Sequence, residues 1–114
     1  MPDFGSPFAG LGKERKMTDA ELVRAVRFAV AAEYEAVQLY MQIAEATENG
    51  LAQAVMKEVA DEERVHAGEF LKLLYHLAPD EERFYAEGYR EVEEKMEELQ
   101  KSCTLKKGQG CRMK

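Results

Sequence analysis

The chain has 114 residues, of which 33% are charged, and its formal net charge is −6. This length allows one small domain, whose core is marginal unless copies of the chain associate. The acidic balance argues against nucleic acid as a partner and suits cations instead. The N-terminus has no signal-peptide pattern, and no apolar segment is long enough to span a membrane. We therefore expect a cytoplasmic protein that binds neither nucleic acid nor membranes.

Residues 1–17 contain two prolines and three glycines and predict an extended N-terminal lead-in. The first helix is expected from Thr18 to about Thr47, because Thr18 and Glu21 have the spacing of a capping box. The sequence Glu48-Asn49-Gly50 predicts the end of this helix and a tight turn into the next one.

The second helix is expected over residues 51–77, and Ala78-Pro79 ends it because a residue before proline avoids the helical region. Pro79 is well placed at the first turn of a third helix, which should run to about residue 100. Residues 101–114 are polar and basic and predict a flexible tail. The tail carries Cys103 and Cys111, which we expect to be reduced thiols; a disulfide or a shared metal is the alternative.

Each of the first two helices carries an apolar stripe whose members alternate in spacing between four and three residues. This spacing is typical of a helix face packed on another helix. Three polar residues interrupt the stripes: Glu33 in the first helix, and Glu63 and His66 in the second. The first stripe comprises Leu22, Val26, Ala29, Glu33, Ala36, Tyr40 and Ile43. The second comprises Ala52, Met56, Val59, Glu63, His66, Phe70, Leu73 and Leu77.

A short turn makes the two helices antiparallel neighbours, and Glu33 then comes level with Glu63. A buried carboxylate without a partner costs several kcal/mol, which a bound cation removes. Carboxylate oxygens with one imidazole are a ligand set for iron or manganese, and Glu63 and His66 lie on one helical face, so they can hold one metal together. The alternative is a metal-free bundle in which these residues form a polar network.

The chain contains one Glu-x-x-His motif and one partner carboxylate, which is half of the set found in four-helix di-iron proteins. A two-fold dimer supplies the other half and completes a four-helix bundle. We therefore expect an all-α fold: an antiparallel helical hairpin with a third C-terminal helix, dimerising into a ferritin-like bundle. Tyr40 is either a core aromatic or a residue near the metal, and Glu35 faces away from the site.

Two blocks of sequence, residues 33–40 and 61–67, resemble those of the encapsulated ferritins, and the resemblance covers residues 18–100. It implies a ferroxidase that oxidises Fe(II) with O₂ at a di-iron site between two chains. Mn, Zn or Ca would be substitutes in vitro. It implies an annular decamer built from dimers, and packaging inside an encapsulin shell that receives the mineral. Carried over by motif, Glu33, Glu63 and His66 are the iron ligands, Tyr40 lies near the centre, and Glu35 belongs to an outer metal site.

The sequence departs from the family pattern at three places. Ala32 stands where relatives often carry an acidic residue, which weakens the outer metal site at Glu35. Leu39 precedes Tyr40 where a tryptophan is common. The shell-docking peptide is expected at the C-terminus, where residues 104–108 are the nearest match. The helical core also resembles the ferritin-like domain fused to some archaeal shells.

We expect the function to be Fe(II) oxidation. One rival is a rubrerythrin-like peroxide reductase, which would use the same site but needs an electron donor, and the chain has no CxxC pair for a rubredoxin-type centre. The other rival is a non-enzymatic helical assembly module.

Overall fold

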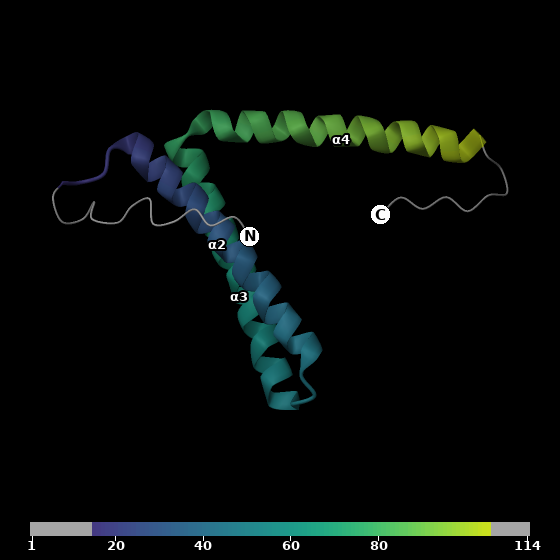
Figure 1. Cartoon of the computed structure of the whole chain (residues 1–114). Helices are drawn as coiled ribbons and strands as arrows, with labels where there is room; N and C mark the ends of the chain where they lie inside the picture. Colours follow the sequence, from purple (N-terminus) through teal and green to yellow (C-terminus); the bar gives the residue numbers. More distant parts are fainter. Residues whose placement is uncertain (1–14, 106–114) are drawn as a thin grey trace. The chain divides into compact units, whose positions relative to one another are not determined.

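The computed structural model describes residues 15–105; of Leu105 it describes the backbone alone. These residues form three helices (Figure 1). They are α2 (Asp19–Ala46), α3 (Gly50–Leu77) and α4 (Pro79–Leu105). The described residues contain no strand, so the expected all-α class is confirmed. The expectations for residues 1–14, Cys111 and the end of the 104–108 segment lie outside the described residues.

The capping box predicted at the start of α2 is present. Thr18 Oγ1 accepts a hydrogen bond from the Glu21 amide at 3.2 Å, and the Glu21 carboxylate accepts one from the Thr18 amide at 3.0 Å. Arg15 adds two hydrogen bonds of 2.7 and 2.9 Å to the same carboxylate. The two hydrogen bonds of the capping box satisfy amides that a helix N-terminus leaves without partners, and Arg15 neutralises the charge of the capping carboxylate.

The turn between α2 and α3 is held by side chains as well as by the backbone. Asn49 caps α3 by accepting a hydrogen bond from the Ala52 amide at 2.9 Å. The Gln53 side chain donates to the Thr47 carbonyl at 2.7 Å. The expected turn at residues 48–50 is therefore correct, except that Gly50 already belongs to α3.

Helices α2 and α3 lie side by side and form the hairpin seen in Figure 1. Their shared core is a narrow line of mostly small side chains, which lets the two backbones approach closely. The buried residues are Val26, Val30 and Ala44 from α2 and Ala60, Ala67 and Leu74 from α3. The hairpin ends at Ala78 as one compact unit, and α4 belongs to a second unit.

The residues that are buried between α2 and α3 differ from the apolar stripes that the sequence predicted. The stripes include Val26 but otherwise lie beside this line, and their members Leu22 and Leu73 are 37% and 43% exposed. Two helices can cover each other only along one face, so the neighbouring faces of the hairpin stay open. The stripes therefore form an open flank of the hairpin as well as part of its core.

Helix α4 begins at Pro79 as expected and continues to Leu105, about five residues further than the sequence indicated. Cys103 lies in its last turn and is disulfide-bonded, so the expectation of a reduced thiol there is wrong. Within residues 15–105, no helix combines the length and hydropathy needed to cross a bilayer.

Candidate metal site

The three polar residues that interrupt the stripes come together on the hairpin. The Nδ1 atom of His66 lies 3.6 Å from Oε2 of Glu63 and 3.8 Å from Oε2 of Glu33. One potential ligand atom from each of the three residues lies within 4.8 Å of the other two. This confirms the register that the short turn predicted, because Glu33 on α2 stands level with Glu63 and His66 on α3.

Local helix geometry explains two of these contacts. Glu63 and His66 are three residues apart on α3, which places their side chains on one face. Glu33 reaches them from α2 because the two helices are close at this level, where Ala60 and Ala67 are both buried. Small residues on one helix thus set the distance at which ligands from both helices can meet.

The three side chains differ in exposure, and this changes one expectation. The side chains of Glu33 and Glu63 are 16% and 17% exposed, whereas that of His66 is 46% exposed. His66 therefore does not occupy a buried position in the single chain, as its place on the stripe had predicted. The imidazole stands at the open flank of the hairpin, where another molecule could contact it.

The residues fit a divalent cation. Glu33 Oε2 is buried and has no hydrogen-bond partner. A buried carboxylate oxygen without a hydrogen-bond partner is costly. A cation held between Glu33, Glu63 and His66, which we call the trio, would compensate this cost. Oxygen ligands with one imidazole suit Fe(II), Mn(II) or Zn(II) better than they suit soft ions such as Cu(I).

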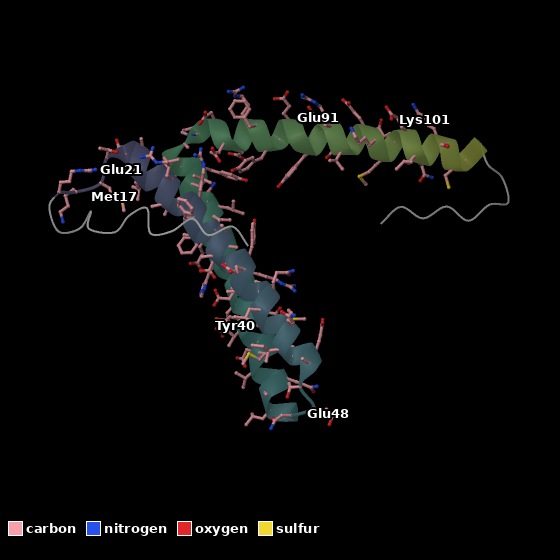
Figure 2. All side chains as sticks on the ribbon, in the orientation of Figure 1. Met17, Glu21, Tyr40, Glu48, Glu91 and Lys101 are labelled. Atoms are coloured by element: carbon pink, nitrogen blue, oxygen red, sulfur yellow. The ribbon has the colours of Figure 1, made fainter. Side chains whose placement is uncertain are left out.

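Two other residues of the expected site remain outside the trio. Tyr40 is half-buried on α2, two helical turns from Glu33, between the trio and the turn near Glu48 (Figure 2). Glu35 is exposed. In residues 15–105, no second group of three or more acidic, histidine or cysteine side chains has metal-binding geometry.

The sequence of this chain matches the rubrerythrin family over residues 25–110. It is 43% identical over 76 residues to the encapsulin nanocompartment cargo protein EncC of Myxococcus xanthus, covering 67% of this chain and 58% of that protein. It is 34% identical over 84 residues to a ferritin-like–encapsulin shell fusion protein of Pyrococcus furiosus, covering 74% of this chain. The chain spans only 24% of the fusion protein's length.

Among solved structures, the encapsulated ferritin domain from Pyrococcus furiosus is similar to this chain, with a TM-score of 0.71 and 34% identity. The similarity covers 77% of this chain and 89% of that domain. These likenesses agree with the ferritin-like fold and with the resemblance seen in the two sequence blocks. Since the family match extends over most of the chain, the protein belongs to the rubrerythrin family and has a ferritin-like fold.

Proposed function

We propose that two copies of this chain pair across the open flank of the hairpin and oxidise Fe(II) with O₂ at the site so formed. The observation that carries the proposal is the trio of Glu33, Glu63 and His66, with its buried and unpartnered carboxylate oxygen. A two-fold axis beside the trio would bring four carboxylates and two imidazoles together. That is the ligand set of four-helix di-iron proteins.

Exposed apolar residues support pairing on this flank. Leu73 follows His66 by two turns of α3, and its exposed fraction is 43%. Val55 precedes His66 by about three turns, and its exposed fraction is 45%. On α2, Leu22 lies on the same stripe as Glu33 and is 37% exposed. Burying these side chains against a second hairpin would contribute about 25 cal/mol for each Å² of apolar surface removed from water.

Iron is the substrate of the proposed reaction. Two bound Fe(II) ions supply two electrons, which together with two protons reduce one O₂ to H₂O₂. The two glutamates offset the positive charge that rises when Fe(II) becomes Fe(III), and His66 supplies a neutral nitrogen ligand. The acidic chain, with a net charge of −6, also attracts the cation to the protein.

The similar proteins suggest where the oxidised iron goes. One is named an encapsulin nanocompartment cargo protein and another a ferritin-like–encapsulin shell fusion protein. We infer that this chain is likewise a cargo of an encapsulin shell in the cytoplasm, and that the shell receives the iron mineral. The annular decamer implied by the family resemblance belongs to the same proposal.

Aerobic Fe(II) titration followed by ferric absorbance, with native mass measurement in parallel, tests the function. The variants Glu63→Ala and His66→Ala should lose the ferric signal and the two metals per dimer. The matched control is Glu62→Ala, since Glu62 is an exposed carboxylate beside Glu63. If either ligand variant oxidises Fe(II) at the parent rate, the assignment of the ligands is wrong.

A peroxide reductase is the second candidate, and the match to the rubrerythrin family favours it. It would use the same trio, with H₂O₂ as the oxidant in place of O₂. Anaerobic protein loaded with Fe(II) distinguishes the two, because a peroxide reductase reacts much faster with H₂O₂ than with O₂.

A metal-free assembly module is the third candidate. It would bind no iron, and Glu33→Ala would leave its assembly unchanged.

A further inference from the structure

Cys103 lies half-buried in the last turn of α4 and is disulfide-bonded. The chain contains two cysteines, and no cysteine within residues 15–105 is free. Cys111 lies outside the described residues and is the only other cysteine in the sequence. The bond within one chain therefore joins Cys103 to Cys111, and we call it the C-terminal disulfide.

The C-terminal disulfide links no two of the three helices. Both cysteines belong to the unit of residues 79–114, and Cys111 follows the end of α4. Seven residues separate the two cysteines, so the closed loop is short. Structural disulfides are typical of small secreted domains, where they hold together segments with too small a core. This bond constrains only a short stretch of chain and does not hold the hairpin together.

The surroundings of the bond fit a reversible pair of thiols. The cytoplasm keeps most thiols reduced, and the disulfides found there are usually transient and serve catalysis or redox sensing. The proposed function places this chain in the cytoplasm. Ser102 and Thr104, the neighbours of Cys103, are exposed, so small oxidants and reductants can reach this end of α4.

The proposed iron chemistry supplies an oxidant for the two thiols. One thiolate attacks an oxygen of H₂O₂ and breaks the O–O bond, which leaves a sulfenic acid and releases one water. The second thiolate attacks this sulfur, the S–O bond breaks, and a second water leaves. The two sulfurs lose two electrons, which the peroxide takes up, and both thiol protons end in the waters. Two thiols and one H₂O₂ thus give one disulfide and two waters.

The bond limits how far the segment between the cysteines can extend. The two cysteines are eight positions apart in the sequence, and an extended chain of that length spans about 26 Å. A disulfide holds the two Cα atoms within about 7 Å of each other. The loop contains residues 104–108, the nearest match to a shell-docking peptide. A peptide that binds its partner in extended form is therefore available only in the reduced chain.

We propose that the C-terminal disulfide controls docking to the shell: the reduced chain docks through residues 104–108, and H₂O₂ closes the bond and prevents docking. This inference rests on the proposed function, because the iron site supplies the peroxide and the shell is the partner. It also sets an order of events. A reduced chain enters a shell, whereas a chain that has already oxidised iron outside a shell is not packaged.

Counting alkylated cysteines by intact mass tests the oxidation step. The chain is reduced, separated from the reductant without oxygen, and given either Fe(II) with O₂ or H₂O₂ alone. We expect both treatments to protect the two cysteines of the parent from alkylation. Glu63→Ala should respond to H₂O₂ alone. A parent that stays fully alkylated after H₂O₂ would overturn the proposal, and so would a disulfide that glutathione cannot reduce.

Co-expression with the cognate shell protein tests the docking step in cells with a reducing cytoplasm and in cells with an oxidising one. The parent should be present in shells from the reducing cells. In shells from the oxidising cells it should fall to the background level of a chain that ends at Leu105. The matched control carries Cys103→Ser and Cys111→Ser together and should be packaged equally in both. Equal packaging of a parent whose disulfide is verified by alkylation would overturn the proposal.

The outcomes separate this proposal from the proposed function. A parent that oxidises no Fe(II), but whose docking and thiols respond to added H₂O₂, contradicts the iron chemistry and leaves the control of docking intact. A parent that oxidises Fe(II) but keeps both thiols in H₂O₂ contradicts the control of docking alone. Absence of the parent from the shells of both kinds of cell contradicts the cargo role and, with it, the control of docking.

Discussion

The Nδ1 atom of His66 on α3 lies 3.8 Å from Oε2 of Glu33 on α2, and this carboxylate oxygen is buried without a hydrogen-bond partner. The two residues come from different helices, so their proximity depends on the register of the hairpin. A carboxylate in this state destabilises the metal-free protein. The proposed metal site accounts for this carboxylate, because a bound cation would compensate its burial.

Glu33→Gln should abolish stabilisation by metal while leaving the metal-free fold at least as stable, because the amide keeps the shape of the side chain and removes its charge. A ligand at one hundred times its dissociation constant stabilises a protein by about 2.7 kcal/mol. For a domain of this size, that corresponds to a rise in Tm on the order of 10 °C. Thermal unfolding with and without anaerobic Fe(II) measures the difference.

The control for this experiment is Glu45→Gln, an exposed carboxylate on the same helix. It should keep the full rise in Tm. An undiminished rise in Glu33→Gln would mean that the metal binds elsewhere on the chain.

Two adjacent leucines on α3 should have separable effects. Leu74 is 1% exposed, so Leu74→Ala leaves a cavity in the hairpin and should lower the free energy of unfolding by about 3 kcal/mol. Leu73 is 43% exposed on the flank that carries His66, so Leu73→Ala should mainly weaken the dimer. Urea unfolding measures the first effect, and the dependence of mass on protein concentration measures the second. Equal losses of dimer in both variants would contradict pairing on this flank.

The capping contacts at the start of α2 make stability depend on pH. Hydrogen bonds from Arg15, and then the backbone hydrogen bond of Thr18, lower the pKa of Glu21 from 4.5 to about 2. Because the pKa is lower in the folded state, the charged carboxylate stabilises the fold above pH 4.5. This contribution is lost as the pH falls towards 2. Arg15→Ala removes the largest cause of the shift, so the pKa of Glu21 should rise.

An NMR titration of the Glu21 side-chain carboxyl checks this pKa directly. The Tm of Arg15→Ala should also depend less on pH than that of the parent between pH 4.5 and 2. Lys16→Ala, which changes the neighbouring exposed cation, should behave as the parent does. A parent Glu21 that titrates near 4.5 would mean that the contacts with Arg15 do not persist in solution.

The sequence predicted the parts of this structure that local rules control. Thr18 and Glu21 form the capping box that their spacing indicated, and Pro79 begins α4. The turn at residues 48–50 is short, and this length fixed the register that brings Glu33 level with Glu63. These features depend on backbone chemistry and helix geometry within a few residues, so one sequence is sufficient to predict them.

The features that the sequence did not predict depend on which helix or chain packs against a given helix face. A four-three stripe indicates a face that contacts some partner, but it does not distinguish the partner helix from a second chain. His66 was therefore expected to be buried and is 46% exposed in the single chain. The end of α4 was also placed too early, because the polar sequence around Lys101 resembles a tail and its helical state depends on the preceding turns.

The C-terminal residues 106–114 should be required for packaging and dispensable for iron oxidation. This segment contains four basic residues and no acidic ones, and it follows an acidic helix. It is also where the family resemblance places the shell-docking peptide. A chain that ends at Leu105, co-expressed with the cognate encapsulin shell protein, should oxidise Fe(II) as the parent does but be absent from purified shells.

Gel analysis of gradient-purified shells measures the packaged fraction. The control for length is a chain in which a Gly-Ser stretch of equal length replaces residues 106–114. Equal packaging of the truncated chain and the parent would place the docking contact on the helices themselves.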